Sequence, residues 1–261
     1  MTVLSISLGQ MNIELGEVKN NFRNAGRMIA EASRRKSSVI VLPELWSTGY
    51  DLENAKQHAD ELNKGMFNNL SKVATQYNIA VVGSILEQRG DNVANSATFF
   101  SPKGRMMGVY RKIHLFRLFD EDKWLEEGNA PLVMDLPWGP TGIAICYDLR
   151  FPELFRAYAV DDNAKLVFVT AEWPLERIEH WRALLVARAI ENQCFIVATN
   201  AVGDTGGTIF GGHSMIVDPW GKIVVEAGES EQLLTVDIEV DDVDAVREKI
   251  PVFEDRRPGL Y

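Results

Sequence analysis

The feature that most constrains the fold is an alternation of short apolar runs with segments whose apolar residues have helical spacing. Residues 38–43 (SVIVLP) form a short apolar run of the kind expected for a buried strand. Residues 20–34 instead carry apolar side chains at Phe22, Ala25 and Ile29, along one helical face. The expected strands are 2–10, 38–43, 79–86, 96–100, 105–110, 142–146, 166–171, 195–200, 214–217, 222–226 and 233–238. The expected helices are 20–34, 54–77 with a break near Gly65, 152–160, 180–192 and 240–249.

This order of elements predicts one α/β domain over residues 1–261, because no low-complexity linker divides the chain. Mixed strands with helices outside them favour two packed sheets flanked by helices, a four-layer α-β-β-α sandwich. The last residues, 250–261 (IPVFEDRRPGLY), form a polar and aromatic tail. We expect this tail to pack on a partner subunit.

Charge and cysteine content narrow the function classes. The net charge of −10 gives no basic face for nucleic acid or an anionic membrane, so neither is expected as a partner. No apolar run approaches the roughly 18 residues that span a bilayer. The two cysteines have no disulfide or metal-site spacing, which predicts a reduced, cytoplasmic protein. The histidines also lack metal-ligand spacing, and we expect no metal and no cofactor.

Cys146 stands at the carboxyl end of an expected strand, the edge at which α/β proteins bind ligands. Most free cysteines are small core residues, however, and that interpretation remains open for Cys146 taken alone. Cys194 lies among Gln193, Phe195 and Ile196 and is interpreted as a packing residue.

Glu44 and Lys112 occupy comparable positions at the ends of other expected strands. Glu44 directly follows the apolar run 38–43, where desolvation would make it a usable general base. Lys112 follows the strand 105–110 and could supply a fixed positive charge to an oxyanion. Each alone is more simply a solvated side chain. Together with Cys146 they supply a thiol, a base and a cation without histidine.

These residues lie in motifs that resemble the nitrilase superfamily of carbon–nitrogen hydrolases. The matching stretches are LPELWSTGYD around Glu44, YRKIHLF around Lys112 and CYDLRFPELFR from Cys146 onward. Further matches, AEWP, HWRALLVARAIENQ and GGHSMIVDPWG, extend the resemblance over essentially the whole chain. The resemblance implies the four-layer sandwich and a homodimer or higher homo-oligomer.

The resemblance also implies a role for each of these residues. Cys146 corresponds to the nucleophile, Glu44 to the general base and Lys112 to the cation that stabilises the oxyanion. The backbone amide of Tyr147 corresponds to a second oxyanion donor. Attack of the thiol on a carboxamide would then give a thioester, which water hydrolyses.

A second family glutamate follows the lysine within a few residues, in the segment HLFRLFDEDKW. We assign it to Glu121, with Asp120 and Glu126 as alternatives. Its implied role is to position the substrate amide and the lysine.

Within the superfamily the motifs look most like those of bacterial ω-amidases. That branch hydrolyses the terminal carboxamide of small 2-oxo acids, 2-oxoglutaramate or 2-oxosuccinamate. The alternatives are a deaminated glutathione amidase, an N-carbamoyl amide hydrolase, or a catalytically silent scaffold of the same fold.

Two aromatic residues are expected to contact the substrate besides Tyr147. Tyr50 corresponds to a substrate-contacting tyrosine of ω-amidases, and Trp173 follows the strand 166–171, where it would wall the pocket. An anionic substrate also needs a cation in this acidic protein. The candidates in sequence are Arg117, Lys123, Arg150 and Arg177.

Overall fold

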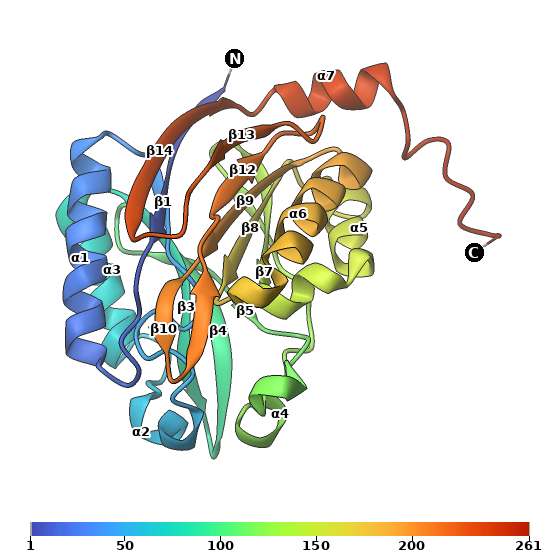
Figure 1. The fold of residues 1–261 in the computed structure, drawn as a ribbon. Helices are drawn as coiled ribbons and strands as arrows, with labels where there is room; N and C mark the ends of the chain where they lie inside the picture. The colour runs from blue at the N-terminus through green and yellow to red at the C-terminus, as the bar shows by residue number, and fades with distance from the viewer. Residues whose placement is uncertain (1, 261) are drawn as a thin grey trace.

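In the computed structural model, which describes residues 2–260, two six-stranded sheets pack face to face (Figure 1). The first sheet has the order β14 (Gln232–Glu239), β1 (Val3–Gln10), β2 (Val39–Val41), β3 (Ala80–Arg89), β4 (Asn92–Phe100) and β5 (Met106–Arg111). The second has the order β13 (Ile223–Glu226), β12 (Met215–Val217), β9 (Phe195–Asn200), β8 (Leu166–Ala171), β7 (Gly139–Ile145) and β6 (Val133–Leu136).

Helices cover the outer face of each sheet (Figure 1). The first sheet carries α1 (Val18–Arg34) and α3 (Gly65–Tyr77), and the second carries α5 (Pro152–Val160) and α6 (Ile178–Asn192). Alternation along β2 separates the two apolar layers, since Val39 and Val41 join the cluster between the sheets while Ile40 joins the cluster under α1 and α3. The predicted single-domain α-β-β-α sandwich is confirmed.

Several element boundaries differ from the prediction. The expected strand 142–146 ends at Ile145, and Cys146 opens a 3-10 helix, η3 (Cys146–Arg150). The expected helix 54–77 is three pieces: η1 (Leu52–Asn54), α2 (Ala55–His58) and α3. The remaining short helices are η2 (Arg117–Phe119), α4 (Glu121–Trp124), η4 (Leu175–Arg177) and α7 (Asp242–Lys249).

Three strands lie outside the prediction. Strand β6 is a short edge strand, and β10 (Val202–Thr205) with β11 (Thr208–Gly211) forms a separate hairpin closed by Gly206 and Gly207. Both glycines have φ in the left-handed region, which a tight turn requires. Glycine is depleted in strands, so the glycine-rich sequence here carries little strand signal.

Parallel pairing brings three strand ends to one edge of the sandwich. Strand β2 is parallel to β1 and β3, and β7 is parallel to β8. Glu44 therefore follows β2 on one sheet, while Cys146 and Glu172 follow β7 and β8 on the other. Side chains at the carboxyl ends of such strands share one region of space.

The tail after α7 runs away from the body of the domain (Figure 1). Phe253 holds its near part, because the guanidinium groups of Arg156 and Arg247 lie 5.5 and 5.2 Å from its ring centroid. Leu260 is 67% exposed. Packing of this tail on a partner subunit remains a prediction, and Tyr261 lies outside the described residues. No helix within residues 2–260 is both long and apolar enough to cross a membrane.

Candidate active site

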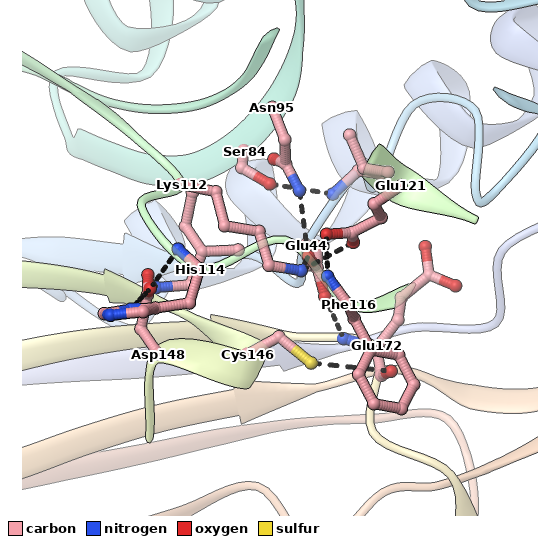
Figure 2. A network of polar contacts seen from close by, with 12 residues as sticks. Glu44, Ser84, Asn95, Lys112, His114, Phe116, Glu121, Cys146, Asp148 and Glu172 are labelled. Atoms are coloured by element: carbon pink, nitrogen blue, oxygen red, sulfur yellow. Dashed lines mark hydrogen bonds and ion pairs between the residues drawn. The ribbon is translucent and has the colours of Figure 1, made fainter. Parts of the chain in front are cut away.

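Glu44 lies at the centre of a buried polar network where the two sheets meet (Figure 2). Its Oε1 accepts hydrogen bonds from Lys112 Nζ at 2.7 Å and from Asn95 Nδ2 at 2.8 Å. Its Oε2 accepts one from the backbone N–H of Glu172 at 3.0 Å. The carboxylate is thus held by groups from both sheets.

Lys112 directly follows β5 and joins two carboxylates. Its Nζ lies 2.7 Å from Glu44 Oε1 and 2.6 Å from Glu121 Oε1, and all three side chains are fully buried. Burial disfavours the ammonium, but the carboxylates of Glu121 and Glu44 outweigh it and raise the pKa of Lys112 above its ordinary value. Lys112 therefore remains a fixed cation. We call these three residues the Glu44–Lys112–Glu121 cluster.

Of the three acidic residues considered after Lys112, it is Glu121 that contacts the lysine. Its second oxygen accepts the backbone N–H of Phe116 at 2.8 Å, which fixes the carboxyl group. Burial, and then the charge of Glu44, raise the pKa of Glu121, while Lys112 lowers it. Asp120 instead forms an exposed ion pair with Lys123, and Glu126 forms one with Arg89.

Cys146 sits at a sharp turn between β7 and η3. Its φ of 42° lies in the left-handed region, which is uncommon for a residue with a side chain. The carboxylate of Asp148 stabilises this turn by accepting the backbone N–H of Ile145 at 2.9 Å and the hydroxyl of Tyr110 at 2.7 Å. The other Asp148 oxygen accepts the backbone N–H of His114 and bonds its ring nitrogen. A buried anchor thus holds Cys146 in a strained conformation.

The sulfur of Cys146 is buried beside this network (Figure 2). Its Sγ donates a weak hydrogen bond to the carbonyl oxygen of Glu172 at 3.8 Å. Burial first, and then the carboxylate of Glu44, raise the pKa of Cys146 well above its ordinary value, and Lys112 opposes them only in part. The resting group is therefore a thiol, so its reaction as a nucleophile requires a base.

A small cavity of about 20 Å³ opens onto Cys146. Tyr147 and Trp173 are part of its wall, as are Arg150 and Arg177. Its other lining residues are Phe116, Phe119, Cys146, Glu172 and Pro174. Larger hollows at residues 52–57 and 33–38 contain none of Glu44, Lys112, Glu121 or Cys146 in their walls, so volume alone does not identify the site.

Of the other residues predicted to bind substrate, some lie close to Cys146 and Lys112 and others lie elsewhere on the protein. The hydroxyl of Tyr50 lies 3.5 Å from Lys112 Nζ, and its ring packs edge-on against Phe119 with 4.9 Å between centroids. Arg117 is exposed, and Lys123 lines a different hollow. Of the four cation candidates, Arg150 and Arg177 line the Cys146 cavity.

Sequence reasoning missed three polar residues of the site. Glu172 directly follows the apolar strand β8, the same signal that identified Glu44, so that rule could have found it. Asn95 lies in the middle of β4, and Asp148 lies in a turn that resembles a solvated helix start. Neither position carries a signal in the sequence, because their partners are 51 and 38 residues away.

A sandwich of this kind, with a buried carboxylate and ammonium beside a buried thiol, is typical of hydrolases that act on carbon–nitrogen bonds other than peptide bonds. Residues 5–248 match the carbon–nitrogen hydrolase family, and the chain belongs to that family.

Relatives and solved structures agree with this assignment. The chain is 40% identical to a 2-oxoglutaramate amidase of Bacillus subtilis over 98% of this chain and 99% of the relative. A carbon–nitrogen hydrolase superfamily protein of Xanthomonas campestris, with an arsenic adduct in its active site, superposes with a TM-score of 0.93, 29% identity and 98% coverage of both chains. A mutant amidase of Nesterenkonia, in which acrylamide has added to the active-site cysteine, superposes with a TM-score of 0.88, 26% identity and 98% coverage of both chains.

Proposed function

We propose that this hydrolase is a cysteine-dependent amidase that cleaves the terminal carboxamide of a small 2-oxo acid, such as 2-oxoglutaramate, to an acid and ammonia. The observation that carries the proposal is the Glu44–Lys112–Glu121 cluster, buried beside the Cys146 thiol, which itself lines a cavity. The activity of the Bacillus subtilis relative supports the substrate class. The acrylamide adduct in the Nesterenkonia amidase supports Cys146 as the reacting thiol.

In the first half of the reaction, Glu44 takes the thiol proton as Cys146 Sγ attacks the carboxamide carbon. The oxyanion that forms is stabilised by the Lys112 ammonium and the backbone N–H of Tyr147. Glu44 then gives its proton to the departing nitrogen, the C–N bond breaks, and ammonia leaves. The acyl group remains on sulfur as a thioester.

In the second half, Glu44 is again a carboxylate and removes a proton from an attacking water. The resulting tetrahedral oxyanion uses the same two donors, Lys112 and the Tyr147 amide. Collapse breaks the C–S bond, releases the carboxylic acid and returns the proton to sulfur. Glu121 holds Lys112 and the substrate amide in position throughout, and the Tyr50 hydroxyl also accepts a hydrogen bond from Lys112.

The cavity wall supports a substrate that has an anionic end. Arg150 and Arg177 lie on the wall that also holds Cys146, and a guanidinium suits a carboxylate because its donors form a planar fork. Trp173 contacts both residues: its ring lies 4.7 Å from the Arg150 guanidinium, and its ring N–H donates to the backbone carbonyl oxygen of Arg177.

A substrate panel tests this function directly. Ammonia release is measured with 2-oxoglutaramate, deaminated glutathione, N-carbamoyl-β-alanine and a simple nitrile. We expect the highest kcat/KM with 2-oxoglutaramate, and replacement of Arg150 or Arg177 by leucine to raise its KM about 10-fold or more. A higher kcat/KM with one of the other three compounds would contradict the proposed substrate class.

A further inference from the structure

Glu172 is a buried acid at the active site whose side chain has no role in the proposed amidase mechanism. Its backbone is part of the centre, because its N–H donates to Glu44 and its carbonyl oxygen accepts from Cys146 Sγ. Its side chain is fully buried and lines the Cys146 cavity. In Figure 2 the carboxyl group of Glu172 has no dashed line and stands apart from the network that joins Glu44, Lys112 and Glu121.

The side chain lacks the partners that a buried carboxylate requires. Neither carboxyl oxygen of Glu172 has a hydrogen-bond partner within residues 2–260. Lys112 already bonds two other carboxylates, those of Glu44 and Glu121. A buried, unpaired carboxylate takes up a proton in preference to remaining charged.

The groups around Glu172 act mainly in the same direction. Burial, followed by the carboxylate of Glu44, raises the pKa of Glu172 well above its ordinary value, and Lys112 opposes the shift only in part. Neither arginine of the cavity wall forms a hydrogen bond with the Glu172 carboxyl group; Arg177 pairs with Glu176, and Arg150 stacks on Trp173. The other titratable groups at the site are Tyr50, Glu121, Cys146 and Tyr147, and the last two line the same cavity as Glu172.

We propose that Glu172 is a substrate-binding residue that holds a proton and donates a hydrogen bond to the 2-oxo acid end of the substrate. A protonated carboxyl group offers one O–H donor, whereas a carboxylate only accepts and would repel an anionic substrate. The proposal rests on the proposed function for the identity of the bound group. It accounts for the presence of an unpartnered acid in the wall, because the partner is supplied by the ligand.

The same chemistry gives the site a preference between related amides. A 2-oxo oxygen accepts the Glu172 proton, but the ammonium of the corresponding 2-amino acid cannot accept a hydrogen bond. A protonated Glu172 therefore selects 2-oxo amides against 2-amino amides such as glutamine. An ionised Glu172 would have the opposite preference.

Binding is measured by calorimetry in the Cys146→Ala background, so that no turnover intervenes. Glu172→Gln keeps the shape and an N–H donor, and we expect its dissociation constant for 2-oxoglutaramate to stay within about threefold of the parent. Glu172→Met keeps the size without a donor and should bind about 10- to 100-fold more weakly. An equal loss in both variants, or tighter binding of glutamine than of 2-oxoglutaramate by the parent, would overturn the proposal.

Two measurements on the enzyme without substrate separate this proposal from the proposed function. The infrared difference spectrum of wild type minus Glu172→Gln should contain the carbonyl stretch of a protonated carboxylic acid, and its absence would overturn the proposal. Glu172→Met should raise the melting temperature, because it removes an unpartnered buried polar group. A lower melting temperature would indicate a structural role instead. If the parent fails to bind 2-oxoglutaramate, the proposed function fails, while the infrared band still decides whether Glu172 holds a proton.

Discussion

Lys112→Met is the substitution whose effect on stability follows most directly from the buried cluster. Lys112 Nζ bonds both Glu44 and Glu121, and all three side chains are fully buried. Methionine preserves the apolar stem but leaves two buried carboxylates without their shared cation. Removing one partner of a buried ion pair lowers the free energy of unfolding by about 3–5 kcal/mol, and we expect a loss of this size near neutral pH.

The loss should also depend on pH, with a sign that the cluster dictates. Lys112 lowers the pKa of Glu121, so its removal raises that pKa further above the unfolded value of about 4.3. The folded variant then keeps a proton that the unfolded chain releases. Stability is therefore retained at low pH and falls as pH rises towards the folded pKa, by about 1.4 kcal/mol per pH unit.

Urea unfolding followed by circular dichroism measures this effect at about pH 5.5 and about pH 7.5, for wild type and variant alike. The loss caused by Lys112→Met should be greater at the higher pH, by up to about 2.7 kcal/mol for one proton. Lys123→Met is the matched control, because Lys123 pairs with Asp120 on the surface, and it should change stability little at either pH. A variant as stable as wild type, or a loss identical at both pH values, would refute the reasoning.

Further predictions concern the two cysteines and the turn that holds one of them. Cys146 should be alkylated faster than Cys194, because Cys146 lines a cavity whereas Cys194 is fully buried in a hydrophobic cluster; peptide mapping that finds equal rates would favour a site without a reactive thiol. Asp148→Asn places an amide NH₂ against donors that now meet a carboxylate oxygen, so the free energy of unfolding should fall by about 3 kcal/mol or more; unchanged urea unfolding would show that Asp148 does not anchor the turn. Glu121→Gln should lower kcat about 100-fold without unfolding the protein, whereas full activity would remove Glu121 from the mechanism.

The layered fold was predictable because its signals are local. Apolar runs of strand length alternate with helical patterns. The run at Val39–Val41 is continuous because this strand is buried on both faces. The predicted strand ends differ from the observed ones by one residue or more. At Ile145, for example, the end of the strand is set by a turn that depends on Asp148 and on its distant partner Tyr110. The hairpin β10–β11 was missed because its glycines serve a turn between two very short strands.

The sequence predicted which residues form the candidate site better than it predicted the contacts between them. Glu44, Lys112 and Cys146 each follow a strand, and that pattern is visible in the sequence. Their contacts join residues up to 128 positions apart, as between Glu44 and the backbone N–H of Glu172, and this contact depends on how the two sheets meet. Glu172 shows the limit most clearly, since its lack of partners is a property of the packed cavity.

Trapping of the acyl-enzyme tests the account most directly. Wild-type protein is mixed with 2-oxoglutaramate, quenched in acid during the first turnover and digested, and the peptides are examined by mass spectrometry. The account predicts that the peptide containing Cys146 gains the mass of the substrate less ammonia, and that Cys146→Ala shows neither adduct nor ammonia release. Ammonia release with Cys146 unmodified throughout, or undiminished in Cys146→Ala, would contradict it.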